Sequence, residues 1–431
     1  MQNLESVQIA AYGVSPFDRL PSLRLLKNYT ILQLEATTVE SSLKSTDVKI
    51  QFFPFTFDEI GSSSTVKVIA SEQFADWFYS KENHFTHFVF FEVTPQIQEI
   101  ADKLGMKLIG PDSQIAQKLE NKIQVRSILP KYLFAPFEIC RDVTDIQKIV
   151  DSLGCDLVIQ IPDSAGGRGT FFVRTLEELQ KVVRAYPLPL LISRRKNGIN
   201  ASIQGVTLRN GMTFSTAPQL NYFGVSGLVC EAKESGQFCG GEWGNAITKD
   251  ISGQAQDLIQ IIGQKLINVG YFGIFGVDIL VDQDKIWVIE INARQTGLTP
   301  IITYLCNQSQ NISLLDLAIQ DSVTQNYHPA NNVQLKSGLI QATNSKLTYL
   351  ILYNTSKDKK IMRYGIIPNF PDIQIVGLEK ANKIVKPGGR LARLITSKQL
   401  VNTRSNTLTG KGIVVIDSIL TRLLKSVITS E

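Results

Sequence analysis

Short hydrophobic runs separated by polar loops occupy the first quarter of the chain. The runs that we predict to be strands are residues 7–13, 29–36, 66–71 and 87–93. Residues 95–110 combine a helical pattern with a final apolar run, which predicts a helix followed by a strand. Because strands that alternate with helices usually form a parallel sheet, we expect a Rossmann-like α/β domain over residues 1–111. No GxGxxG motif accompanies it, so a dinucleotide is not the expected ligand.

Helical spacing dominates from Asp112 onward. The segment 112–129 places Ile115, Leu119 and Ile123 on one face, and it predicts a helix with Asp112 as its N-cap. We expect further helices at residues 142–154, 175–186 and 255–270. We expect strands at residues 155–162 and 170–173. The last hundred or so residues are predicted to form mixed strands and a final helix.

A hairpin two-thirds of the way along the chain, over residues 275–297, carries polar residues inside apolar strands. They are three oxygen donors and a guanidinium, at Asp278, Glu290, Asn292 and Arg294. Side chains alternate across a strand, so Glu290, Asn292 and Arg294 are expected to share one face. The other face is expected to carry Trp287, Ile289 and Ile291.

A loop of odd length in this hairpin would place Asp278 opposite Glu290, so that the oxygen donors converge. Mg²⁺ prefers oxygen ligands and is commonly bound by one or two carboxylates together with substrate phosphates. Buried carboxylates without a partner are costly, which favours a cation between them. We therefore predict a Mg²⁺ site at Asp278, Glu290 and Asn292. An edge strand with its polar face in water, or a pair of carboxylates acting as general acid and base, are the alternatives.

A glycine-rich loop, QIPDSAGGRGTFFV, lies upstream between two short strands. Its backbone N–H groups could approach a phosphate closely, because glycine adds no bulk and takes positive φ freely. The residues concerned are Ser164, Gly166, Gly167 and Gly169, with Arg168 able to add charge. A flexible hairpin turn is the alternative. Together with a Mg²⁺ hairpin downstream, the loop predicts a nucleoside triphosphate as ligand.

Composition narrows the chemistry that we expect. The three histidines lie outside any motif, which argues against a histidine-based triad or metal site. The five cysteines are scattered without a CxxC pair, which argues against disulfides and zinc and favours a reducing cytoplasm. The net charge of +5 is spread along the chain, so no nucleic-acid partner is expected. No apolar run approaches about 18 residues and no signal peptide is seen, so no membrane association is expected.

The order of these parts resembles the ATP-grasp superfamily over about residues 1–320. Within it, the chain is similar to biotin carboxylase and to carboxylate–amine ligases such as carnosine synthase and D-alanine–D-alanine ligase. The resemblance implies that ATP and Mg²⁺ are the cofactors, with the metal held by Asp278, Glu290 and Asn292. It implies that Arg294 stabilises the transferred phosphoryl group and that Lys122 reaches the phosphates from a helical segment. A solvated helix lysine is the alternative for Lys122. The loop 164–170 would cover the phosphates.

Two positions depart from the pattern of this superfamily. Gln160 stands where a lysine usually contacts phosphate, so Arg168 or another cation would have to compensate. Ser193 stands where many members have glutamate in the hinge that binds adenine. Only backbone contacts at Ile192, Ser193 and Arg194 therefore carry over.

The resemblance implies an ATP-dependent carboxylate–amine ligase that forms an amide or peptide bond through an acyl phosphate. A carboxylase similar to biotin carboxylase, or an ATP-binding module without turnover, are the alternatives. After Arg294 the chain reads QTG, where biotin carboxylases have QVE. Residues 231–245 stand in the place of an EEAP stretch, and both differences disfavour the carboxylase. The segment 231–245 resembles a loop of some peptide-forming ligases, which implies a place in the acceptor pocket, and a glycine-rich surface loop is the alternative. Small-molecule acids and amines are the expected partners, and many relatives are homodimers.

The resulting division is a pre-ATP-grasp α/β domain at residues 1–111, an ATP-grasp domain at 112–325 and a small α+β domain at 326–431. Residues 112–190 form a lid-like subdomain with the glycine-rich loop. In the last domain, only the segment VKPGGRLARLI resembles the corresponding part of some ligases.

Overall fold

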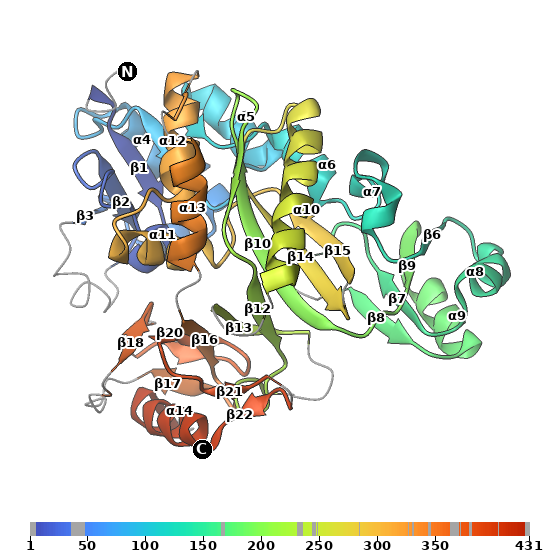
Figure 1. The fold of residues 1–431 in the computed structure, drawn as a ribbon. Coiled ribbons are helices and arrows are strands. Elements are labelled where there is room, and N and C mark those ends of the chain that lie inside the picture. Colours follow the sequence, from blue (N-terminus) through green and yellow to red (C-terminus); the bar gives the residue numbers. More distant parts are fainter. Residues whose placement is uncertain are drawn as a thin grey trace.

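The computed structural model shows a mixed α/β fold built around three sheets (Figure 1). A parallel sheet lies near the N-terminus, a long antiparallel sheet runs through the middle, and a smaller antiparallel sheet projects to one side. The structure describes residues 6–35, 48–164, 169–230, 236–243, 247, 249–283, 285–325, 327–329, 332–343, 346–362, 370, 372–378, 382–403 and 405–426.

The N-terminal sheet is parallel, with strand order β3-β2-β1-β4-β5. Its strands are β1 Ile9–Tyr12, β2 Tyr29–Gln33, β3 Lys49–Phe52, β4 His87–Val89 and β5 Lys107–Ile109. Its helices are η2 Pro16–Arg19, α2 Phe57–Ile60, α3 Thr65–Ile69, α4 Glu72–Tyr79 and α5 Pro95–Leu104. The parallel arrangement expected from the alternating pattern is confirmed.

The strand predicted at residues 66–71 is wrong, because this segment lies mostly in helix α3. The run is too short for its apolar spacing to distinguish a strand from a helix. As a helix it buries Val68 and Ile69 in a cluster with the aromatic residues of α4. The tertiary contacts therefore decided the conformation of this segment.

The central sheet is antiparallel and joins the middle of the chain to its C-terminal part. Its order is β15-β14-β10-β12-β13-β16-β20-β18, with β11 paired to β10. The strands are β10 Ile199–Thr207, β11 Thr213–Ser215, β12 Gln219–Phe223, β13 Phe238–Trp243, β14 Gly273–Asp282, β15 Lys285–Asn292, β16 Leu347–Tyr353, β18 Ile373–Val376 and β20 Arg390–Thr396. Segments on both sides of the boundary predicted at residue 325 share this sheet. The three-domain division stays a prediction.

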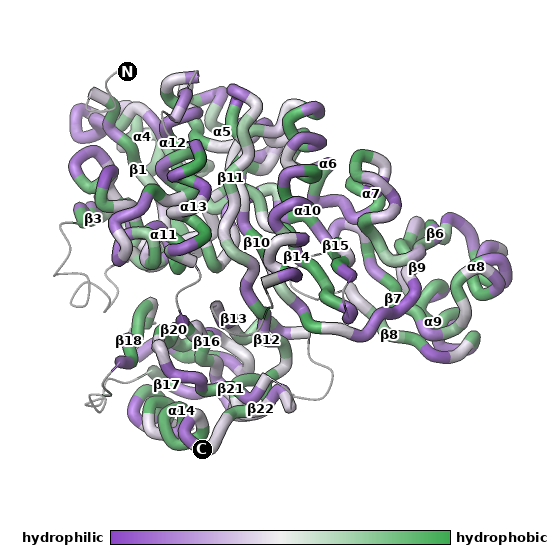
Figure 2. Tube along the Cα trace, in the orientation of Figure 1, coloured by the Kyte–Doolittle hydropathy of each residue, from purple (hydrophilic) through white to green (hydrophobic). Residues whose placement is uncertain are grey.

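Helices cover both ends of this sheet (Figure 1). They are α10 Lys249–Asn268, α11 Thr299–Gln308, α12 Leu314–Thr324, α13 Asn332–Thr343 and α14 Gly410–Leu423. The smaller strands of the C-terminal part are β17 Lys360–Met362, β19 Ile384–Val385, β21 Val401–Asn402, β22 Thr407–Leu408 and β23 Leu424–Ser426. Figure 2 shows hydrophobic stretches along many strands and hydrophilic ones in many turns. Over the described residues, helices that could cross a membrane are absent.

The lid-like sheet projects from the body and has the order β6-β9-β7-β8 (Figure 1). Its strands are β6 Phe137–Cys140, β7 Leu157–Gln160, β8 Thr170–Val173 and β9 Leu190–Arg194. The helices α8 Asp145–Leu153 and α9 Leu176–Ala185 pack on it, and their apolar faces form a core with the strands. The helices predicted at 142–154 and 175–186 are therefore confirmed.

The helix predicted over residues 112–129 is divided into α6 Ser113–Glu120 and α7 Val125–Ile128, and the short η3 Lys131–Leu133 follows. Asn121 causes the break, because its side-chain oxygen accepts hydrogen bonds from the backbone of Ile123 at 3.1 Å and of Gln124 at 2.9 Å. Side chains of this type compete with the helical hydrogen-bond ladder. Lys122 therefore lies in a turn and not on a helix.

Candidate active site

A β-bulge sets the register of the β14–β15 hairpin. Asp282 pairs with Lys285 across a turn of two residues, and Ile279 pairs with Val288. An unbroken ladder would then place Asp278 opposite Ile289. The register shifts between Asp278 and Ile279, so that Asp278 lies opposite Glu290. The predicted pairing is therefore present, but the odd loop length that we expected to produce it is wrong.

The same bulge changes which face Trp287 occupies. Trp287 pairs with Leu280, two residues from Asp278, so it lies on the site face and the predicted grouping with Ile291 is wrong. Val288 and Ile291 instead point into the core beneath α10. Trp287 contacts two lysines, with Lys285 Nζ at 3.8 Å and Lys196 Nζ at 5.2 Å from its ring centroid.

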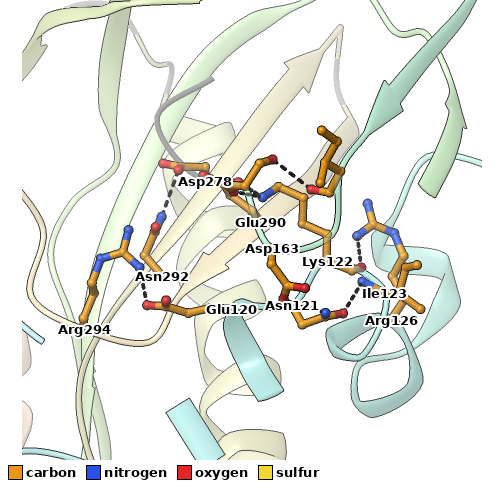
Figure 3. A network of polar contacts seen from close by, with 12 residues as sticks. Glu120, Asn121, Lys122, Ile123, Arg126, Asp163, Asp278, Glu290, Asn292 and Arg294 are labelled. Atoms are coloured by element: carbon orange, nitrogen blue, oxygen red, sulfur yellow. Dashed lines mark hydrogen bonds and ion pairs between the residues drawn. The ribbon is translucent and has the colours of Figure 1, made fainter. Parts of the chain in front are cut away.

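The side chains of Asp278, Glu290 and Asn292 lie next to one another (Figure 3). Asn292 Nδ2 donates to Asp278 Oδ2 at 3.0 Å, and the Ser202 hydroxyl donates to Asp278 Oδ1. Burial, together with the neighbouring Glu290 carboxylate, raises the pKa of Asp278. Two carboxylates and an amide are a donor set that suits Mg²⁺, whose remaining ligands are usually phosphate oxygens and water. The residues therefore fit the metal that the sequence predicts.

Lys122 is buried beside this carboxylate pair. Its ammonium lies 3.2 Å from Glu290 Oε2 and donates to the Ser164 carbonyl, while its backbone N–H donates to the Pro162 carbonyl at 3.0 Å. Only 4% of Lys122 is exposed, so the alternative of a solvated helix lysine is excluded. The turn that carries Lys122 thus connects the metal hairpin to the start of the glycine-rich loop.

Arg294 lies on the other side of the metal donors. Its guanidinium donates to Glu120 at the end of α6 and lies 3.8 Å from Glu92 Oε2. Burial raises the pKa of Glu120, although Arg294 opposes this shift. Arg294 and Lys122 therefore place one cation on either side of the oxygen donors, within the same cleft (Figure 3).

A cleft of about 250 Å³ opens along these residues. The polar residues that line it include Glu92, Ser113, Glu120, Lys122, Asp163, Ser164, Glu290, Asn292 and Arg294. The hairpin therefore does not face bulk solvent as a bare edge strand, which was one alternative. Of the three oxygen donors, Glu290 and Asn292 line this cavity, which has room for a phosphate group.

The glycine-rich loop connects β7 to β8 as a hairpin, in which Gln160 pairs with Thr170. Gly166, Gly167 and Arg168 lie outside the described residues. Gly169 has φ +87°, and a Cβ atom there would lie 2.9 Å from the Ser164 side chain. Gln160 is buried, and Lys122 brings a cation to the base of this loop through the Ser164 carbonyl.

Comparisons with known proteins show what this chain is similar to. The family profile of the ATP-grasp domain matches residues 119–298. This part of the chain is similar to the ATP-grasp domain. The resemblance predicted from the sequence is therefore confirmed.

Curated relatives of the chain are distant. A [butirosin acyl-carrier protein]–L-glutamate ligase from Niallia circulans is 20% identical over 52% of this chain and 55% of its own length. A formate-dependent phosphoribosylglycinamide formyltransferase from Pseudomonas entomophila is 24% identical over 58% of this chain and 65% of its own length. The chain thus spans between half and two-thirds of these relatives.

Solved structures share the fold along almost the whole chain. Biotin carboxylase from Campylobacter jejuni has a TM-score of 0.65 at 14% identity, covering 99% of this chain and 93% of that one. An N5-carboxyaminoimidazole synthase from Aspergillus clavatus, solved with ADP and 5-aminoimidazole ribonucleotide, has a TM-score of 0.60 at 14% identity, covering 96% and 99%. At these identities the likeness concerns the fold alone.

The residues predicted to form the adenine hinge, Ile192, Ser193 and Arg194, lie in β9, between β6 and β7. The Arg194 N–H already donates to the Pro136 carbonyl at 2.8 Å, and its side-chain Nε donates to the Leu153 carbonyl at 3.0 Å. Arg194 therefore has no backbone donor left for adenine. Ile192 and Ser193 are both paired in the ladder, and the buried Ser193 hydroxyl has no partner among the described residues.

Two residues that we did not predict support the metal donors. Ser202 on β10 pairs with Asp278 in the ladder, and Asn221 on β12 donates to the Ser202 hydroxyl at 2.6 Å. Gln219 in turn donates to Asn221 at 3.1 Å. The alternating pattern of residues 199–207 marks Ser202 as a polar residue between apolar neighbours, but only the strand order brings it to Asp278.

Replacing Ser202 with alanine is expected to weaken Mn²⁺ binding in the presence of ADP by about 10–100-fold, because residues that orient a metal ligand typically contribute that much. Electron paramagnetic resonance of free Mn²⁺ measures the affinity. Ser215→Ala on β11 is the control, since Ser215 is similarly buried. Equal affinities for the wild type and Ser202→Ala would contradict the prediction.

Replacing Gly169 with alanine is expected to raise the KM for ATP, because a left-handed residue with a Cβ costs about 1–2 kcal/mol and this Cβ also meets Ser164. The control is Gly253→Ala in α10, where nothing lies within 4 Å of the added Cβ. The control should stabilise its helix by up to about 1 kcal/mol. Steady-state kinetics measure the KM for ATP of both variants, and thermal unfolding measures their stability. If both variants raised the KM for ATP to the same extent, the assignment of the loop to ATP binding would be contradicted.

Proposed function

We propose that this protein is an ATP- and Mg²⁺-dependent ligase that joins a small carboxylate to an amine through an acyl phosphate. The observation that carries the proposal is the cleft where the metal donors meet two cations. Asp278 and Glu290 lie opposite each other, with Lys122 on one side and Arg294 on the other. The glutamate ligase among the relatives supports the reaction class.

The reaction has two displacements. A carboxylate oxygen of the acid attacks the γ-phosphorus of ATP, the bond to the bridging oxygen breaks, and ADP leaves. The amine nitrogen then attacks the carbonyl carbon of the acyl phosphate, loses a proton and displaces inorganic phosphate. Mg²⁺, when bound, supplies positive charge at the phosphate oxygens. The protein's own contribution is positioning and electrostatics, which fits a site without histidine.

Both cations of the site are paired with carboxylates in this structure. Lys122 contacts Glu290, and Arg294 contacts Glu120. With ATP bound, Lys122 would donate to phosphate oxygens and leave Glu290 to the metal. Arg294 would donate to the transferred phosphoryl group. Exchange of one anionic partner for another keeps these buried charges compensated, because an unpaired buried charge is costly.

Small-molecule acids and amines are the proposed substrates. A homodimer is also proposed, since a related biotin carboxylase domain from Hydrogenobacter thermophilus was solved as a dimer with MgADP. Sedimentation equilibrium of the purified chain measures this state directly.

The function is tested by mixing the protein with ATP, Mg²⁺ and panels of acids and amines, and by measuring ADP release together with the mass of the product. We expect ADP release that requires both an acid and an amine, with one amide bond formed per ADP. Removal of the metal with EDTA should abolish the reaction, and added Mg²⁺ should restore it. The control omits either substrate.

Two outcomes would overturn the proposal. ADP release that needs only bicarbonate would indicate a carboxylase. Nucleotide binding without turnover under every combination would indicate a binding module.

A further inference from the structure

A buried glutamine contacts the turn that follows Arg294. Gln204 of β10 is only 2% exposed. Its side-chain Nε2 donates to the Thr296 hydroxyl, and its Oε1 accepts a hydrogen bond from the Thr299 hydroxyl at 3.1 Å. A buried amide is costly unless it is hydrogen-bonded, so a glutamine at this place needs such partners. Both of them come from one turn, residues 294–299.

The two threonines pass this restraint on to the backbone of the turn. The Thr299 hydroxyl accepts from the Thr296 N–H at 3.0 Å, and the Thr296 hydroxyl accepts from the Leu298 N–H at 3.2 Å. The Thr299 N–H donates to the Thr296 carbonyl at 3.1 Å. These local bonds fix the shape of the turn. Gln204 fixes the position of the turn relative to the central sheet, because β10 lies inside that sheet.

Gly276 makes room for this turn next to a metal donor. It pairs with Gln204 across β10 and β14, and with Asn292 across β14 and β15. A Cβ atom on Gly276 would lie 2.8 Å from Thr296 Cγ2 and 3.6 Å from Asn292 Cβ. The next row on the same face, two residues along each strand, holds Ser202, Asp278 and Glu290. The turn is therefore anchored beside the metal donors.

The position of Arg294 relative to the metal donors depends on this turn. The Arg294 guanidinium contacts two carboxylates from outside the central sheet, Glu92 and Glu120. The Gln295 side-chain amide donates to the Phe90 carbonyl at 3.0 Å, just after β4 of the N-terminal sheet. The turn therefore connects two parts of the molecule, and the buried glutamine amide holds the end that lies on the metal hairpin.

We propose that Gln204 is a positioning residue for phosphoryl transfer, which sets the turn 294–299 on the sheet so that the Arg294 guanidinium reaches the transferred phosphoryl group. The inference rests on the proposed function for the role of Arg294. Gln204 is buried under the turn and lies outside the lining of the cleft, so it acts through Arg294. Small displacements are costly in such a site, since a shift of about 1 Å can reduce the rate about a hundredfold.

A double-mutant cycle tests this role. Gln204→Met keeps the length of the side chain and removes both of its hydrogen bonds to the turn. It is expected to lower kcat for ADP formation about 10–100-fold, while the KM for ATP stays within about twofold. In an Arg294→Met background the same change is expected to lower kcat less than about twofold, because residues that act through one group are not additive. A role in folding alone would have the same effect in both backgrounds.

Two further variants separate positioning from folding. Thr296→Val keeps the shape of its side chain and removes the hydroxyl that Gln204 contacts, so it is expected to lower kcat and not to change the KM for ATP. It replaces Gln204→Met in the cycle if that protein does not fold. Thr207→Val is the matched control, because Thr207 is also buried in β10 and its hydroxyl donates to the Tyr271 carbonyl at 2.9 Å. Its kcat should equal that of the wild type. Circular dichroism and thermal unfolding check the fold of each protein.

Binding of aluminium fluoride together with MgADP repeats the cycle without turnover, because this anion mimics the transferred phosphoryl group. Gln204→Met is expected to weaken fluoride binding about tenfold in calorimetry and to leave MgADP binding unchanged. This effect should disappear in the Arg294→Met background.

Equal effects in both backgrounds, or a kcat and a fluoride affinity that Gln204→Met and Thr296→Val leave unchanged, would overturn the positioning role. If no acid and amine support turnover, the ligase fails, but the fluoride cycle still decides whether Gln204 acts through Arg294. A wild type that shows neither turnover nor fluoride binding would overturn both proposals.

Discussion

Replacing Asp278 with asparagine is expected to stabilise the unliganded protein and to reduce ADP formation about a thousandfold. The loss follows because a metal ion contributes several kcal/mol of charge stabilisation at the phosphoryl group, and each 1.4 kcal/mol is about a factor of ten. The variant is expected to be more stable because Asp278 lies opposite Glu290, and burial beside the Glu290 carboxylate disfavours the charged form of Asp278. An amide of the same shape removes one charge and can donate to Glu290. We expect an increase of about 1–3 kcal/mol in the free energy of unfolding.

The pH dependence identifies the cause of that stabilisation. Burial and Glu290 raise the pKa of Asp278 in the folded protein. A carboxyl group with a raised folded-state pKa reduces stability above its unfolded pKa, and the penalty disappears once both states are protonated. The advantage of Asp278→Asn should therefore be complete at about pH 8 and absent by about pH 3. Chemical denaturation of both proteins, without nucleotide or metal, measures it. A variant less stable than the wild type at pH 8 would contradict the argument.

Replacing Arg294 with methionine is expected to lower kcat by about 10²–10³-fold while the KM for ATP changes little. A reduction of this size is typical when a preorganised hydrogen-bond donor is removed from the place where charge develops in the transition state. The guanidinium is 17% exposed and is held by Glu120 and Glu92 at the mouth of the cleft. Methionine keeps most of the volume of the side chain and removes its donors. Single-turnover measurements of acyl phosphate formation report the affected step.

Stability must be followed in the same variant, because Glu120 loses its partner. Burial already raises the pKa of Glu120, so the carboxyl group can take up a proton and the protein should remain folded. Arg184→Met on the lid provides the matched control. A rise in the KM for ATP that accounts for the whole loss would assign Arg294 to nucleotide binding instead.

Two charged sites of this protein depend on β-bulges. One bulge opposite Asp278 pairs that residue with Glu290, and the other, at Leu391, places Arg390 and Arg393 on one face. Each bulge adds a single residue and changes the alternation of the strand beyond it. Each therefore brings together side chains that the two-residue period assigns to opposite faces.

The sequence alone predicted much of the fold and the chemistry of the metal donors. Apolar spacing identified α5, α8, α9 and α10, and the alternating elements predicted the parallel N-terminal sheet. Asp278, Glu290 and Asn292 were identified by the chemical contrast of polar oxygen donors within apolar strands. These signals are local, and local spacing is what periodicity records.

Other features could not be predicted because they depend on contacts between distant segments. The run at residues 66–71 became helical when it packed in the core around α4. The predicted helix at 112–129 is interrupted at Asn121, whose side-chain amide donates to the distant Asp163 at 2.7 Å. Ser202 supports Asp278 only because β10 pairs with β14, 76 residues further along the chain. Trp287 changed face through a register shift for which apolar spacing has no signal.

What the sequence by itself determined is the set of chemical groups and the class of elements that carry them, since residue type and short-range period suffice for both. The tertiary structure alone decided which groups meet: Lys122 with Glu290, Arg294 with Glu120, and Arg390 and Arg393 with Asp18. The physical reason is that strand order, bulges and the burial of charge depend on the free energy of the whole packed chain. No window of neighbouring residues contains that information.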